Sequence, residues 1–238
     1  MRDRSTSAGI IYSAIGAQYV DEAAHSASSS LRFNDVPHII YCDRDPKERV
    51  SGVQYVVTAS SGNPYSDKIA NIQRLPFART LYLDTDTHVA GNLDELFDLL
   101  ERFEVAAAHA PGYTKSPDDG QSDAFYDFNT GVIALRDAAA VRDLLALWFR
   151  IQSDWTAKPL FPTNLQDQPA FRRAVWESRV SVYVLGSEYN YRSVFPGRLV
   201  GRAKIIHGRS TNYEKLAAYL NRSIEPRTFL RFPPEWEW

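Results

Sequence analysis

The feature that most constrains the fold is an alternation along the chain between short apolar runs and longer segments of helical period. The short runs, such as residues 9–15, are rich in β-branched and aromatic residues, which favour strands. The longer segments, such as residues 141–151, carry apolar residues along one helical face. This alternation is typical of a sheet with crossover helices, so we predict an α/β fold.

The boundaries of the elements follow from the same pattern. The predicted strands are residues 9–15, 37–41, 55–57, 80–83, 105–108, 128–135, 180–185 and 203–206. The predicted helices are residues 20–32, 66–75, 92–102, a long helix from residue 137, and residues 168–177. Ser66 is a candidate N-cap, because a serine hydroxyl can accept from the free amides of a first helical turn. The long polar loop 111–123 is predicted to be a lid over a substrate.

Length and charge limit the classes of protein to consider. A chain of 238 residues is within the range of one α/β domain, so we expect a single domain over residues 1–238. Residues 211–238 should form a C-terminal helix and an aromatic tail, which either packs on the domain or docks a partner. The formal net charge of -2 gives no field that would gather nucleic acid, which is not an expected partner.

The location of the protein is predicted from what the sequence lacks. Cys42 is the only cysteine, which excludes an intrachain disulfide and a cysteine-based zinc site and suits a reducing compartment. Residues 1–7 are polar and charged, and no segment reaches the roughly 18 uninterrupted apolar residues of a transmembrane helix. We therefore expect a cytoplasmic protein without a signal peptide or transmembrane segment.

The most informative motif is a pair of carboxylates that follows an apolar strand. Residues 81–86 read Leu-Tyr-Leu-Asp-Thr-Asp. On extended chain, Asp84 and Asp86 would point to the same side about 6.5 Å apart, so both could reach one cation. Mg²⁺ and Mn²⁺ prefer such oxygen ligands and bridge them to substrate phosphates. The alternative is that the pair only caps a turn, but ligands of open α/β sheets collect at this end of the strands.

The order of several motifs resembles one known family. Lys68 precedes the carboxylate pair, and Phe-Asn-Thr-Gly-Val-Ile at residues 128–133, Asp-Gln at 167–168 and Ile-His-Gly at 206–208 follow it. In this order they resemble the retaining glycosyltransferases of family 8, the glycogenin-like group. The resemblance covers residues 9–210 and implies a GT-A fold, a Rossmann-like nucleotide-diphospho-sugar transferase domain with a mixed central sheet flanked by helices.

The resemblance also implies a role for individual residues. Asp84, Asp86 and His207 would bind Mn²⁺ or Mg²⁺ on the pyrophosphate of the donor. Donor-binding positions would be Ser13, Tyr19, Lys68, Thr85, Thr130, Gly131, Gly208 and Arg209. Asn129, Asp167 and Gln168 would act in catalysis. For Lys68 the alternative is a solvated surface lysine, and for Asp167 it is a helix N-cap.

Two departures from the family pattern affect the donor site. The family's Thr-Asn pair in the turn after the first strand is replaced by Ile15 and Gly16, which weakens the assignment of uracil as the base stacked on Tyr19. After His207 the family continues with glycine and lysine, whereas this chain has Gly208 and Arg209. A guanidinium suits bidentate contact with phosphate, so Arg209 takes the role of the phosphate clamp.

The function implied is metal-dependent transfer of a sugar, with retention, from a nucleotide-diphosphate sugar to an acceptor that the sequence does not identify. Uridine diphosphate is the expected nucleotide, because the family mostly uses it. One alternative is a phosphatase of the haloacid dehalogenase type, whose nucleophile motif also resembles residues 84–87 but normally follows the first strand. The other is a nucleotide-sugar-binding module without turnover.

Overall fold

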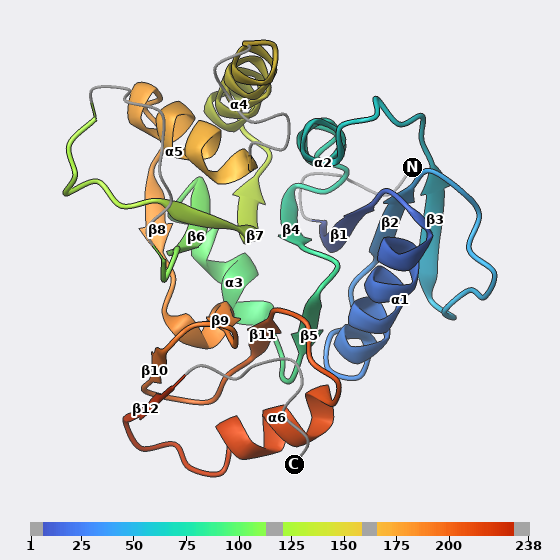
Figure 1. Cartoon of the computed structure of the whole chain (residues 1–238), viewed down its shortest axis with the longest axis vertical. Coiled ribbons are helices and arrows are strands. Elements are labelled where there is room, and N and C mark those ends of the chain that lie inside the picture. Colours follow the sequence, from blue (N-terminus) through green and yellow to red (C-terminus); the bar gives the residue numbers. More distant parts are fainter. Residues whose placement is uncertain (1–6, 113–120, 159–165, 231–238) are drawn as a thin grey trace.

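The computed structural model describes residues 7–112, 121–158 and 166–230. Most of the predicted lid and the aromatic tail from residue 231 onward lie outside the described residues. In the described ranges, seven strands form a central sheet in the order β3-β2-β1-β4-β7-β6-β8 (Figure 1). The strands are β1 (Ala8–Ala14), β2 (His38–Cys42), β3 (Val53–Val57), β4 (Arg79–Leu83), β6 (Val105–His109), β7 (Phe128–Arg136) and β8 (Val182–Val184).

The central sheet is mixed, as predicted. The strands β3, β2, β1 and β4 run parallel to one another, and β6 runs parallel to β8. Between these two groups, β7 is antiparallel to both β4 and β6. Because the first four strands are parallel, their carboxyl ends lie at one edge of the sheet, where open α/β sheets bind ligands. The predicted mixed α/β architecture is therefore confirmed.

Helices cover both faces of this sheet (Figure 1). They are α1 (Ala17–Leu31), α2 (Pro64–Ile72), α3 (Asp94–Leu99), α4 (Ala139–Thr156) and α5 (Asp167–Glu177), whereas α6 (Tyr213–Leu220) lies away from this sheet. Ile10 and Tyr12 of β1 pack in one core with α1 and α3, whereas Ile11 packs in a second core with α2, α4 and α5. Successive side chains of a strand point to opposite faces, so a continuous apolar strand supplies both cores.

The start of α2 differs from the prediction. Oδ1 of Asn63 accepts hydrogen bonds from the backbone N of Tyr65 at 3.0 Å and of Ser66 at 3.1 Å, so Asn63 is the N-cap. Pro64 occupies the first helical position, where its missing N–H costs nothing. Ser66 lies inside the first turn, and the predicted Ser66 cap is wrong. None of the helices in the described ranges combines the length and the apolar character needed to cross a membrane.

Three short strands form a second sheet, which lies below the central one in the view of Figure 1. They are β5 (Thr87–Val89), β9 (Tyr191–Arg192) and β11 (Ile205–His207), in the order β5-β11-β9. Strand β5 follows β4 almost directly, so the two sheets are joined at the carboxylate pair. A further pair, β10 (Gly197–Leu199) and β12 (Arg227–Phe229), packs with α6 in a third core. The sequence did not predict β5, β9, β10 or β12, whose two or three residues carry no readable alternation. The equally short strands β8 and β11 overlap the predicted strands 180–185 and 203–206.

Candidate functional site

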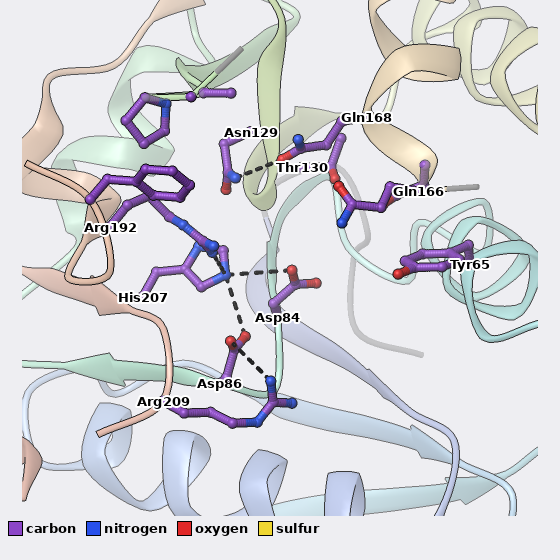
Figure 2. A pocket seen from close by; sticks show the side chains of 15 residues that line it. Tyr65, Asp84, Asp86, Asn129, Thr130, Gln166, Gln168, Arg192, His207 and Arg209 are labelled. Carbon is purple, nitrogen blue, oxygen red and sulfur yellow. Dashed lines mark hydrogen bonds and ion pairs between the residues drawn. The ribbon is translucent and has the colours of Figure 1, made fainter. Parts of the chain in front are cut away.

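Two side chains that follow β4 and a third from a distant part of the sequence meet beyond the carboxyl end of β4 (Figure 2). Nε2 of His207 lies 3.6 Å from Oδ2 of Asp84 and 3.3 Å from Oδ1 of Asp86. The ligand atoms of the three residues all lie within 4.8 Å of one another. Two carboxylates and an imidazole that converge in this way form a donor set that fits Mn²⁺ or Mg²⁺.

The carboxylate pair is placed by a turn and by strand pairing. Asp84 and Asp86 do not lie on extended chain, as the sequence argument assumed, but in the turn between β4 and β5. Oγ1 of Thr87 donates to the backbone O of Asp84 at 2.8 Å and closes this turn. In the antiparallel pair of β5 and β11, His207 lies opposite Thr87, and the backbone N of Gly208 donates to the backbone O of Asp86 at 2.9 Å. Strand pairing therefore brings the histidine to the carboxylates.

The ring of His207 is oriented by a chain of side-chain amides. Its Nδ1 lies 2.8 Å from Oδ1 of Asn190, whose Nδ2 donates to Oδ1 of Asn129 at 2.8 Å. Nδ2 of Asn129 donates to Oε1 of Gln168 at 2.6 Å (Figure 2). This pattern assigns the proton of a neutral imidazole to Nδ1, so Nε2 presents its lone pair toward the carboxylates. Asn190 has the position of an outer-shell partner that fixes a metal-binding histidine.

Gly131 leaves the room that the cluster occupies. A methyl group in place of its hydrogen would lie 1.9 Å from Cε1 of His207 and 2.8 Å from Oδ2 of Asp84. The backbone O of the same residue accepts from the backbone N of Asp84 at 2.7 Å. The resemblance implied a donor-binding position for Gly131. The structure places it against two of the candidate metal ligands, His207 and Asp84.

Lys68 lies between two carboxylates in the interior. Its Nζ is 3.0 Å from Oδ1 of Asp84 and 3.0 Å from Oδ2 of Asp167, and it donates to Oγ1 of Thr130 at 3.2 Å. The side chain is only 9% exposed, so the alternative of a solvated surface lysine is wrong. Burial by itself lowers the pKa of Lys68, but the facing Asp167 and Asp84 outweigh it and raise the pKa above its ordinary value.

Asp167 and Gln168 form the start of α5. The N-cap position belongs to Gln166, and Asp167 is the first helical residue, so the N-cap alternative for Asp167 is wrong. Its carboxylate pairs with Lys68 instead, and its backbone O accepts from Nε1 of Trp148 at 3.0 Å. Asp167 is 3% exposed. The ion pair joins this helix to the metal-ligand cluster through a single lysine.

Arg209 is held by an acidic residue of α1. Its guanidinium donates to both carboxylate oxygens of Glu22, at 2.8 and 3.1 Å, and lies 3.9 Å from Oδ2 of Asp86. It also lies 5.8 Å from the centre of the Tyr19 ring. Oγ1 of Thr85 donates to the same Glu22 at 2.9 Å. The predicted phosphate clamp Arg209 and the base-stacking residue Tyr19 are thus neighbours, and Glu22 joins Arg209 to Thr85.

Arg192 is a functional candidate that the sequence did not indicate. Its Nη1 lies 2.5 Å from Nε2 of His207, and its pKa is lowered by burial although Asp86 and Asp84 act in the opposite direction. No motif surrounds it in the sequence. Its position follows from the parallel pairing of β9 with β11, which sets Arg192 opposite His207.

A cavity of about 500 Å³ opens beside the cluster (Figure 2). Of the predicted site residues, Asp84, Asp86, Asn129, Thr130, Asp167, Gln168, His207 and Arg209 line it, and the structure adds Tyr65, Gln166, Arg192 and Phe195. The lining does not include Ser13, Tyr19, Lys68, Thr85, Gly131 or Gly208. Ser13 accepts from Nδ2 of Asn71, a residue of α2, at 3.0 Å. A volume of this size is typical of small-molecule sites.

The protonation of the cluster also suits a metal ion. Burial by itself raises the pKa of Asp86, whereas His207, when it is protonated, and Arg192 face the carboxylate and lower its pKa below the ordinary value. The carboxylate is therefore ionised at neutral pH, as a metal ligand must be. Among the described residues, Asp84, Asp86 and His207 are the only group of this kind whose ligand atoms converge.

Comparisons with known proteins establish the fold. No protein-family model matches the sequence, and no curated protein matches it. Among solved structures, an active-site mutant of LgtC superposes with a TM-score of 0.60 at 15% identity, covering 89% of this chain and 94% of that chain. Mouse xyloside xylosyltransferase 1 gives 0.56 at 17% identity, covering 85% and 98%. GlyE of Streptococcus pneumoniae gives 0.57 at 18% identity, covering 87% and 55%.

These proteins define the class of fold to which the chain belongs. All three are glycosyltransferases with the GT-A fold, and the match covers nearly the whole of two of them. The chain therefore has the GT-A fold, and the predicted fold class is confirmed.

Proposed function

We propose that this protein is a metal-dependent glycosyltransferase that moves a sugar from a nucleotide-diphosphate donor to an acceptor. The observation that carries the proposal is the convergence of Asp84, Asp86 and His207 on a cavity that Asn129 and Gln168 also line. On a GT-A fold this arrangement supplies both a place for a diphosphate-bound metal and polar groups for a sugar. Xyloside xylosyltransferase 1, LgtC and GlyE, whose structures this chain resembles, are glycosyltransferases, which supports the same class.

In this proposal Asp84, Asp86 and His207 hold Mn²⁺ or Mg²⁺, which when bound supplies a Lewis acid for the departing diphosphate. Arg209 adds positive charge where that diphosphate develops negative charge. Uridine diphosphate is the proposed carrier, with Tyr19 against the base.

We further propose that the transfer retains the anomeric configuration by attack on the face from which the diphosphate departs. The ion pair with Lys68 favours an orienting role for Asp167 over a nucleophilic one, because a carboxylate held by a lysine is a weaker nucleophile. Asn129 and Gln168, which bond to each other, would then stabilise an oxocarbenium-like transition state by polar contacts. A trapped glycosyl-enzyme on Asp167 would contradict this route, and an inverted product would contradict retention.

The phosphatase alternative finds no support in the position of its motif. The haloacid dehalogenase motif follows the first strand, whereas Asp84 follows β4, the fourth strand along the chain, in a GT-A fold.

The proposal is tested with a panel of nucleotide-diphosphate sugars in the presence of Mn²⁺. One responding donor should raise the melting temperature and release its nucleotide slowly into water, and excess chelator should abolish both effects. Response to a guanosine diphosphate sugar equal to that of the uridine diphosphate sugar would contradict the proposed base. Stabilisation without any turnover would instead support the nucleotide-sugar-binding module. Full activity in excess chelator would contradict the metal role.

Replacement of Asn190 by Ala should weaken Mn²⁺ binding about 10- to 100-fold, because His207 would lose the partner that fixes its ring. Asn190→Asp keeps an acceptor for Nδ1 and should retain most of the affinity. Calorimetric titration of Mn²⁺ measures both. Equal affinities for the parent protein and Asn190→Ala would show that the amide chain does not orient the histidine.

A further inference from the structure

The position of Arg192 has a consequence for how the cluster takes up a metal ion. Nδ1 of His207 carries the proton that Asn190 accepts, so Nε2 has the single lone pair of the ring. Nη1 of Arg192 lies 2.5 Å from that nitrogen and donates to it. A metal ion held by Asp84, Asp86 and His207 needs the same lone pair. One lone pair serves one partner, so the guanidinium and the metal exclude each other at this nitrogen.

The charges around the cluster act in the same direction. Asp84 faces Lys68 at 3.0 Å, and Asp86 faces Arg209 at 3.9 Å. Both carboxylates also stabilise the positive charge of Arg192. Lys68 also pairs with Asp167, and Arg209 also pairs with Glu22, so three cations face four carboxylates and leave one net negative charge. A divalent ion changes this to one net positive charge in a partly buried site, and an anion that enters with the ion restores the balance.

The cavity offers Arg192 a second position. Arg192 lines the 500 Å³ cavity beside the cluster, so its guanidinium can turn toward a ligand there without unfolding β9. Nε of Arg192 is buried and has no hydrogen-bond partner among the described residues. A guanidinium with an unused donor is well suited to a diphosphate, which accepts from two of its N–H groups at once.

We propose that Arg192 is an internal competitor for the metal ion, and that the donor's diphosphate relieves the competition by drawing the guanidinium away from His207. Metal and diphosphate then bind cooperatively, because each removes an obstacle to the other. This inference rests on the proposed function, since it requires a metal at the Asp84, Asp86 and His207 cluster.

The test is a titration of the protein with Mn²⁺ without nucleotide, with free Mn²⁺ followed by electron paramagnetic resonance. Arg192→Met should bind Mn²⁺ at least about tenfold more tightly than the parent protein, because the lone pair of His207 becomes available. Arg209→Met is the matched control, because it also removes one positive charge beside Asp86 but does not contact His207. It should gain no more than about threefold, from the change in charge alone.

Two further comparisons separate competition at His207 from a change in local charge, and test the role of the diphosphate. In the His207→Ala background, the gain from Arg192→Met should fall to that of Arg209→Met, since no lone pair remains to be released. With saturating uridine diphosphate, the difference between the parent protein and Arg192→Met should vanish or reverse. Chelation of Mn²⁺ by the nucleotide is the same for both proteins and cancels in that comparison.

Each outcome bears on the proposal. Equal gains for Arg192→Met and Arg209→Met would overturn the competition, while leaving the metal site in place. A difference that persists unchanged with uridine diphosphate would overturn the role of the diphosphate. Absence of Mn²⁺ binding in every variant would overturn the metal site itself, and with it the proposed function. Melting temperatures confirm that each variant is folded, and Arg192→Ala replaces Arg192→Met if the latter is not.

Discussion

Replacement of Asp86 by Asn is expected to lower the rate of sugar transfer by about 10³-fold, because the site loses a metal ligand and a Lewis acid contributes several kcal/mol at the transition state. Asp86 gives a cleaner test than Asp84. Its carboxylate contacts His207 and Arg209, whereas that of Asp84 also holds Lys68 and accepts from the hydroxyl of Tyr82 at 2.7 Å. Initial rates at saturating Mn²⁺, with a responding donor, measure the effect.

The matched control is Asp45→Asn, because Asp45 is an exposed carboxylate that pairs with Arg49, four residues further along the same loop. Its loss should leave both the rate and the stability nearly unchanged. Asp86→Asn should keep its circular dichroism spectrum and lose Mn²⁺ binding together with the rate. A variant that retains more than about a tenth of the parent rate would show that Asp86 is not a metal ligand in the transfer step.

The carboxylate pair of the candidate site could be predicted from the sequence, because its signal is local. An apolar strand that ends in two aspartates is visible within six residues, and its place in an α/β pattern fixes the edge of the sheet at which it lies. His207 was predicted only through the order of motifs in the family that the chain resembles. What brings it to Asp86 is the pairing of β5 with β11, and β5 is a three-residue strand without a periodic pattern.

The partners of Lys68 show the limit of sequence reasoning. The sequence predicts a helix that carries a lysine, but not that the lysine ends between Asp84 and Asp167, which belong to other elements. Such a contact depends on how α2, β4 and α5 pack, which no spacing within one segment encodes. The same holds for Asn190 and Arg192, which are isolated polar residues in the sequence and neighbours of His207 only through β9 and β11.

The N-cap of α2 was predicted wrongly for a different reason. The signal was present, because asparagine followed by proline is typical of an N-cap and first helical position. The predicted cap, Ser66, also carries a side-chain oxygen that can accept from the amides of a first helical turn. The cap is set by the backbone amides that need partners, and Asn63 accepts from two of them.

Replacement of Lys68 by Met is expected to destabilise the protein by about 3–5 kcal/mol, the cost of leaving a buried charge without its partner. Most of the loss should come from Asp167, whose side chain is 5% exposed, rather than from Asp84, whose side chain is 27% exposed and can be solvated. Urea denaturation measures the change in the free energy of unfolding. Donor binding should also be lost, because the two aspartates that Lys68 holds would no longer be fixed.

A double substitution distinguishes the buried pair from a simple loss of packing. If Asp167 is the charge left unpaired, Lys68→Met combined with Asp167→Asn should recover much of the lost stability, since neither buried charge then remains. Lys204→Met is the matched control, because Lys204 pairs with Glu95 at a more exposed position and should contribute no more than about 1 kcal/mol. A loss for Lys68→Met no larger than that for Lys204→Met, or no recovery in the double variant, would show that Asp167 does not depend on this lysine.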